Sequence, residues 1–194
     1  MLDLTHTFAI FPVLETERLI LRAVEPDDAD ALFRMMSDPR VMRYYGRPPL
    51  TSIDEVHARI TGIRTAFEQR EGIRWAITSR ADGAVLGHAG FWRLIKEHFR
   101  AEIGYQLAAE YWGRGIAPEA VGAALRYGFA GMGLHSVEAQ IAPANVASRR
   151  VLEKLGFAQE GYLRECFYLA AEDRFEDTAV FSLLKSAWQA RGGA

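Results

Sequence analysis

Hydrophobic and polar positions in the first part of the chain predict one strand followed by two helices. The segment at 18–24 is rich in aliphatic residues and predicts a strand, and Pro26 after it is typical of the first turn of a helix. Ser52 and Glu55 have the spacing of a capping box, which predicts that a second helix begins there. We expect residues 47–50 to form the loop between the helices. The apolar residues that recur at helical spacing are Ala29, Leu32, Phe33 and Met36 in the first helix and Val56, Ile60, Ile63 and Phe67 in the second.

The middle of the chain changes to the pattern of strands. Short polar segments at 80–83 and 96–99 separate three strand-like runs, and such short connections are typical of an antiparallel meander. The three runs lie at 73–79, 84–95 and 100–108.

The last part of the chain alternates helix and strand and ends in a hairpin. A helix is expected from about Gly115 to Met132, and a strand at 136–142 follows it. Asn145 is a typical N-cap and Gly156 a typical C-terminal stop for the next helix. The segments expected to pair as the closing hairpin are 156–170 and 177–184. Because no repeat or linker interrupts this order, we expect one α+β domain over residues 1–194.

Composition narrows the class of protein. The chain has 194 residues, 49% of them hydrophobic, which is enough for one sizeable core. Its formal net charge of −2 provides no basic field for nucleic acid or an anionic membrane surface. Cys166 is the only cysteine, so no internal disulfide can form, and no paired cysteines have the spacing of a metal site. With no leader or membrane span in the pattern, we expect a cytoplasmic protein without a metal, as a monomer or homodimer.

A glycine pair in "YWGRGIAPEA" marks the first candidate for chemistry. Gly113 and Gly115 lie between a strand and a helix, where unpaired backbone amides and the positive helix end favour an anion. Arg114 can add a charged contact, although an ordinary turn that needs positive φ would explain the glycines equally well. A phosphate loop of the Walker type lacks its Lys-Ser/Thr ending here, and a dinucleotide fingerprint fails at Pro118.

The same segment resembles the pyrophosphate loop of the GNAT superfamily of N-acetyltransferases, whose pattern is Gln/Arg-x-x-Gly-x-Gly/Ala. Trp112 occupies the first position, Gly115 and Ala117 match the small residues, and the Trp-Gly-x-Gly form is similar to the RimJ/RimL branch. Further segments resemble that branch in the same order, at 14–46, 101–115 and 143–165. The resemblance extends from about Leu14 to Trp188.

This resemblance implies a mixed, mostly antiparallel sheet that is splayed at its centre, with helices on both faces. It implies acetyl-CoA as co-substrate, held between the strand at 100–108 and the strand at 136–142. Gly104 suits the bulge that the family has in its central strand, although a close packing contact would explain it too. The residues that the resemblance places at the cofactor are Ile103, Tyr105, Leu107, Trp112, Gly113, Arg114, Gly115, Ile116, Ala117 and Asn145.

Two residues are candidates for catalysis. By its residues alone, Asn145 with Ser148 is a plausible helix cap; by resemblance, Ser148 lies near the thioester sulfur as a proton donor. Other members of the superfamily use a tyrosine one turn later, where this chain has Leu152. Glu102 can face the cleft from its strand and act as a base, or it can be an ordinary paired glutamate.

The resulting hypothesis is transfer of acetyl from acetyl-CoA to a primary amine by direct attack in a ternary complex. A protein α-amine with a pKa near ~7.8 is neutral in roughly a tenth of molecules at pH 7, whereas a lysine amine is neutral in well under ~1%. An N-terminal α-amine therefore needs less help from a base. A small amine, such as a polyamine, amino acid or antibiotic, is the alternative acceptor, and a non-catalytic acyl-CoA-binding regulator is the alternative class.

Overall fold

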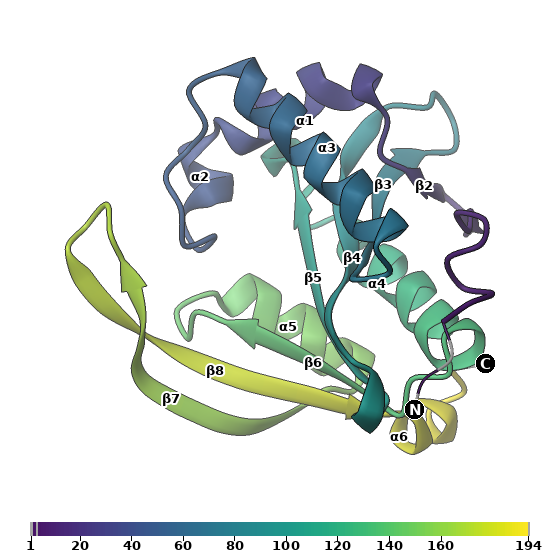
Figure 1. Cartoon of the computed structure of the whole chain (residues 1–194). Helices are drawn as coiled ribbons and strands as arrows, with labels where there is room; N and C mark the ends of the chain where they lie inside the picture. Colours follow the sequence, from purple (N-terminus) through teal and green to yellow (C-terminus); the bar gives the residue numbers. More distant parts are fainter. Residues whose placement is uncertain (1, 3, 194) are drawn as a thin grey trace.

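The computed structural model describes residue 2 and residues 4–193, and its centre is an eight-stranded sheet (Figure 1). The strand order is β1-β2-β3-β4-β5-β6-β8-β7, and every neighbouring pair is antiparallel except β5 with β6. The strands are β1 (Leu14–Glu15), β2 (Leu19–Ala23), β3 (Ile73–Ser79), β4 (Val85–Ile95), β5 (Arg100–Leu107), β6 (Ser136–Ile141), β7 (Ala158–Leu169) and β8 (Arg174–Leu184). The expected mixed, mostly antiparallel sheet is thus confirmed.

Six α-helices and several shorter turns connect these strands in the described chain. The helices are α1 (Ala29–Met36), α2 (Pro39–Met42), α3 (Ile53–Glu68), α4 (Ile116–Arg126), α5 (Val146–Leu155) and α6 (Lys185–Ala190). The 3₁₀ turns are η1 (Pro26–Asp28), η2 (Lys96–His98) and η3 (Ala109–Tyr111), and η4 (Tyr127–Gly131) is a π-helical turn that continues α4.

The central feature of the sheet is the separation of β5 from β6. These strands pair in parallel only where Arg100–Glu102 meets Ser136–Glu138. Beyond Glu102, β5 remains paired with β4 as far as Leu107, while β6 remains paired with β8 as far as Ile141. The two strands diverge in Figure 1, so the β6 side of residues 103–107 borders a gap. The splayed centre expected from the sequence is confirmed.

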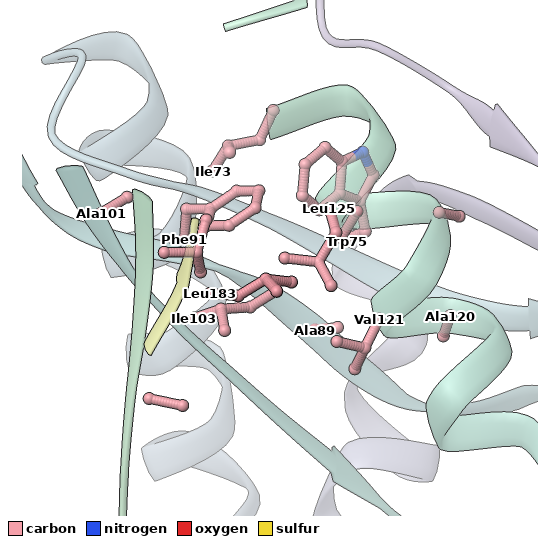
Figure 2. Packing of buried hydrophobic residues seen from close by; sticks show 14 of the residues in the cluster. Ile73, Trp75, Ala89, Phe91, Ala101, Ile103, Ala120, Val121, Leu125 and Leu183 are labelled. Carbon is pink, nitrogen blue, oxygen red and sulfur yellow. The ribbon is translucent and has the colours of Figure 1, made fainter. Parts of the chain in front are cut away.

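Helices cover both faces of the sheet, and each face has its own apolar core. On one face, α4 packs against the central strands; Val121 and Leu125 lie beside Trp75, Phe91 and Ile103 (Figure 2). On the other face, α1, α2 and α3 form a second cluster. Because successive side chains of a strand point to opposite faces, neighbouring residues of β5 reach different cores.

Local capping signals explain where the helices begin and end. The predicted capping box of Ser52 and Glu55 is present at the start of α3. Asn145 caps α5 through its side chain, and Gly156 ends that helix with φ of 94°, as expected. The helix expected over 115–132 is present as α4 with its π-helical turn.

Three short elements have no counterpart in the sequence-based expectation: β1, α2 and α6. Each has at most six residues, so none is long enough to show a clear helical or strand period. Three apolar residues near the N-terminus are also buried. Leu2, Leu4 and Phe8 belong to the same apolar cluster as the side chains of α4. The indole of Trp75 donates to the Pro12 carbonyl oxygen over 2.8 Å and ties this N-terminal segment to the sheet.

Candidate functional site

The glycine loop before α4 has the backbone conformation that the sequence predicted. Gly113 and Gly115 have φ of 72° and 74°, values that side-chain-bearing residues rarely adopt, and Gly115 is the N-cap of α4. Residues 113–115 are exposed. The first amides of α4 therefore have no partner one turn earlier and are open to an anion.

Arg18, which no sequence motif indicated, holds this loop in place. Its Nη1 donates to the carbonyl oxygen of Arg114 over 3.0 Å, and its Nε donates to Glu119 Oε2 over 2.7 Å. Burial opposes ionisation of Glu119, but hydrogen bonds from Thr16 and Arg18 outweigh it and hold the pKa of Glu119 below its ordinary value. Arg18 thus balances a carboxylate in the first turn of α4 that would otherwise repel an anion. Because Arg18 lies 96 residues from Arg114 in the chain, only the fold reveals the contact.

Trp112 connects the loop to the end of the central strand. Its indole Nε1 donates to the Leu107 carbonyl oxygen over 2.9 Å, and its side chain is about half exposed. Arg114 lies over the ring of Tyr111, with 5.8 Å between the guanidinium carbon and the ring centroid. The loop is therefore fastened to β5 at one end and to β2 through Arg18 at the other.

Asn145, Ser148 and Tyr105 form a connected group beside the gap. Asn145 Oδ1 accepts a hydrogen bond from the Ser148 amide over 3.0 Å, which confirms the helix-cap interpretation of this pair. The hydroxyl oxygens of Tyr105 and Ser148 are 2.8 Å apart. Burial raises the pKa of Tyr105 to about 12, against the opposing hydrogen bond with Ser148, so the phenol stays protonated at neutral pH. Leu152, one turn later, is fully buried in the core.

The sequence did not predict the contact between the side chains of Tyr105 and Ser148. The family resemblance placed Tyr105 at the cofactor, but only as part of its strand. Tyr105 and Ser148 lie 43 residues apart, on β5 and α5. No local spacing relates a strand residue to a helix residue at that separation, so the contact depends on how α5 packs against the sheet.

Glu102 is buried at the last position where β5 pairs with β6. Its Oε2 accepts a hydrogen bond from Arg93 Nη1 over 2.8 Å. Burial raises the pKa of Glu102; the charge of Arg93 opposes this rise, and the nearby Glu138 adds to it. A carboxylate whose pKa lies above its ordinary value is a stronger proton acceptor than a solvated glutamate.

Glu102 and Tyr105 are three residues apart on β5, so their side chains point to opposite faces of the sheet. Tyr105 packs against the core under α4, whereas Glu102 lies across from Trp92, which points to the face of α1 and α3. The side chains of Glu102 and Tyr105 thus lie near the start of the gap on opposite faces of the sheet.

Gly104 corrects one expectation. The register between β4 and β5 is regular at Gly90 and Gly104, and its irregularity lies between Trp92 and Ile95 instead. The prediction of a bulge at Gly104 is therefore wrong, and the alternative, a close packing contact, is confirmed. A Cβ atom on Gly104 would clash with the Trp92 ring, so glycine is what allows the indole to pack against β5 at this position.

Comparison with known proteins identifies this architecture. The family model of the acetyltransferase (GNAT) domain matches residues 18–158. The chain belongs to the GNAT family. It is an acetyl-CoA-dependent N-acetyltransferase of RimJ-like type.

Relatives and a solved structure agree with this assignment over nearly the whole chain. An N-acetyltransferase of Bacillus subtilis, YoaA, is 39% identical over 91% of this chain and 98% of its own length. The alanine N-acetyltransferase of ribosomal protein uS5 from Escherichia coli is 27% identical, over 90% of this chain and 92% of its own. The structure of spermidine N-acetyltransferase from Vibrio cholerae with CoA and spermine has the same fold, with a TM-score of 0.78, 24% identity, and coverage of 90% of this chain and 99% of its own.

Neither a membrane-spanning helix nor a metal-binding cluster is found among the described residues. None of their helices is both long and apolar enough to cross a membrane. Their His, Cys, Asp and Glu side chains form no group of three or more that could hold a metal ion.

The contact between Arg93 and Glu102 predicts a measurable change in titration. In an Arg93→Gln variant, the pKa of Glu102 should rise further, because the effect of burial is no longer opposed by the positive charge of Arg93. Carbon-detected NMR titration of the side-chain carboxyl would measure it. Arg80→Gln is the matched control, since Arg80 pairs with Glu15 instead. An unchanged Glu102 titration in Arg93→Gln would contradict this account of the pKa.

Proposed function

We propose that this GNAT enzyme transfers the acetyl group of acetyl-CoA to the α-amine at the N-terminus of a protein, by direct attack in a ternary complex. One observation carries the proposal: the gap between β5 and β6 has a buried carboxylate at one side and a hydrogen-bonded Tyr105–Ser148 pair at the other. The N-terminal loop of α4 adjoins the end of β5.

In this proposal the loop at 113–117 binds the diphosphate of acetyl-CoA. Backbone amides and the helix end provide the anion site, Arg114 provides positive charge, and Arg18 neutralises Glu119. The unpaired side of β5 offers backbone groups to the amide-containing arm of the cofactor. The residues assigned to cofactor binding are Ile103, Tyr105, Leu107, Trp112, Gly113, Arg114, Gly115, Ile116, Ala117 and Asn145.

Glu102 acts in the proposed reaction as the general base, directly or through one water. It takes the proton that the amine loses as the nitrogen forms its bond to the acetyl carbon. Its raised pKa suits this task, because a base works best when its pKa approaches the working pH. The Arg93 guanidinium keeps enough of the carboxylate ionised to accept the proton.

As the carbon–sulfur bond breaks, Ser148 acts as a hydrogen-bond donor to the sulfur, or relays to the thiolate a proton that it regains from water. A serine hydroxyl is a weak acid, but the sulfur of a leaving thiol needs little assistance, with a pKa near ~8.5. The hydroxyl of Tyr105 lies 2.8 Å from that of Ser148 and stays protonated, so Tyr105 serves as a positioning residue.

The proposed acceptor is supported by acid–base chemistry and by relatedness. A single buried carboxylate can handle an α-amine, of which roughly a tenth is already neutral at pH 7. The relative from Escherichia coli is named for alanine acetylation of a ribosomal protein. The solved structure with spermine makes a polyamine the competing acceptor.

An acceptor panel tests the function. Peptides with a free α-amine should release CoA from acetyl-CoA, whereas the same peptides with an acetylated N-terminus and a free lysine should release almost none, as a thiol-reactive dye would report. Spermidine is the small-amine comparison. Release with spermidine alone would overturn the protein acceptor, and binding of acetyl-CoA with no release for any amine would indicate a regulator.

Gly115→Asp tests the diphosphate site. The substitution places a negative charge where the phosphates are expected and forces a side chain into positive φ, so the Kd for CoA should rise at least about tenfold. Calorimetry measures it. Gly83→Asp is a control for the positive φ, because Gly83 has φ of 72° in a turn between β3 and β4, with no atom within 4 Å of an added Cβ; at Gly115 the nearest atom is Arg18 Nη2, 3.5 Å away. Equal CoA affinity in the two variants would show that the loop is misassigned.

Ser148→Ala and Tyr105→Phe test the proton donor. Ser148→Ala should lower kcat about tenfold to a hundredfold with little change in the Kd for acetyl-CoA, since the lost contact matters only as the thiolate forms. Tyr105→Phe should lower kcat less, and the double variant should be no slower than Ser148→Ala, because Tyr105 acts through Ser148. Additive losses in kcat would contradict that dependence.

A further inference from the structure

A groove under the C-terminal half of α3 carries an unusual concentration of positive charge. It encloses about 660 Å³ between α3 and the adjoining ends of β3 and β4. Its charged lining consists of Arg59, Arg70, Arg74, Arg93, Lys96 and one acid, Glu71. The groove is therefore cationic although the whole chain has a net charge of −2.

Most of these cations form no ion pair within the part of the chain that the structure describes, although Arg59 is close enough to Glu55 to interact with it electrostatically. Arg93 alone among the five forms an ion pair there, with Glu102. Arg74 lies over the Trp92 ring, 5.0 Å from its centroid, and Arg59 lies over the Tyr45 ring at 5.7 Å. Stacking on an aromatic ring leaves the outer edge of a guanidinium free to bind an anion in two-pronged fashion.

The groove borders the proposed base. Arg93 and Trp92 both line it; Arg93 donates to Glu102, and Trp92 lies across from Glu102 in the sheet register. An acceptor whose amine reaches Glu102 therefore has its next few residues beside the groove. By contrast, α4, whose loop is the proposed diphosphate site, packs on the opposite face of the sheet.

A buried histidine, His88, lies on the same face of the sheet. His88 is almost fully buried, and neither ring nitrogen has a hydrogen-bond partner among the described residues. Burial lowers the pKa of His88 to about 3, and the charges of Arg74 and Arg59 act in the same direction. His88 is therefore neutral at physiological pH and adds no charge to this face of the sheet.

The remaining lining is largely apolar, with the partly exposed Ile63, Ala66 and Leu94 among its residues. An anionic group on an apolar stem matches such a surface, whereas a polyamine with several positive charges would be repelled along its length. A cavity of this size accommodates a few residues of a peptide.

We propose that this groove binds an acidic side chain of the acceptor, so that the enzyme selects protein N-termini with Asp or Glu among their first few residues. This inference rests on the function proposed above and adds the substrate class. Paired guanidinium groups hold the carboxylate while the α-amine lies at Glu102.

Three peptides that differ at one position test the selectivity. They begin Ala-Ala-Glu, Ala-Ala-Gln and Ala-Ala-Lys and share a neutral tail, so their α-amines have similar pKa values. We expect kcat/KM to be about tenfold higher for the Glu peptide than for the Gln peptide and lowest for the Lys peptide. Added salt should reduce the preference, because the attraction is electrostatic.

Variants assign the preference to the groove. Arg70→Gln and Arg59→Gln should each reduce the ratio of the Glu to the Gln peptide about threefold or more. Arg64→Gln, on the same helix, is the matched control, because Arg64 is paired with Glu25 outside the groove, 3.8 Å away. Its peptide preference should equal that of the unaltered enzyme. A similar loss of preference in all three variants would indicate a general charge effect and overturn the proposal.

A binding measurement separates this inference from the proposed function. N-acetylated forms of the same peptides cannot accept acetyl, and calorimetry in the presence of CoA should still rank them Glu, Gln, Lys. Equal transfer to all three free peptides, together with equal binding of the three blocked peptides, would refute the proposed role of the groove. It would leave the proposed acetylation of α-amines unaffected. Ranked binding without transfer to any peptide would refute the proposed function and retain the groove as an anion site.

Discussion

The separation of β5 from β6 is the constraint on which the rest of the site depends. Parallel pairing at three positions aligns the two strands, and each then follows its antiparallel partner, β4 or β8, in a different direction. An interior strand thereby gains an unpaired edge in the middle of a sheet, where backbone groups are normally satisfied. In the function proposed above, this edge binds the amide groups of the co-substrate, while the other edge of β5 stays paired with β4.

In the proposed mechanism, one strand, β5, provides functional side chains on both faces of the sheet. Glu102 and Tyr105 differ by three positions and so point to opposite faces, and burial raises the pKa of both. The same physical cause has opposite consequences: the carboxylate becomes a stronger proton acceptor, and the phenol becomes a more secure donor. The two groups need no direct contact, because each approaches the gap from its own face.

Positive charge is also found on both faces of the sheet. Arg18 and Arg114 lie at the loop before α4, and the arginines of the groove lie beneath α3 on the other face. A chain with a small net negative charge can thus present two local cationic regions, one suited to phosphates and one suited to a carboxylate. The net charge excluded a general attraction to polyanions, but it could not indicate these local sites.

The sequence by itself determined the features that depend on residues close together in the chain. The capping box at Ser52, the cap at Asn145 and the two positive-φ glycines before α4 are local signals, and hydrophobic periodicity indicated the long strands and helices. Family resemblance added the splayed centre of the sheet. Only the tertiary structure decided which distant residues meet: Arg18 with Arg114, Tyr105 with Ser148, and Trp92 with Gly104, where a bulge was expected. These contacts depend on the packing of whole elements, in which the direction of each side chain follows from sheet register and helix placement, and no short stretch of sequence contains that information.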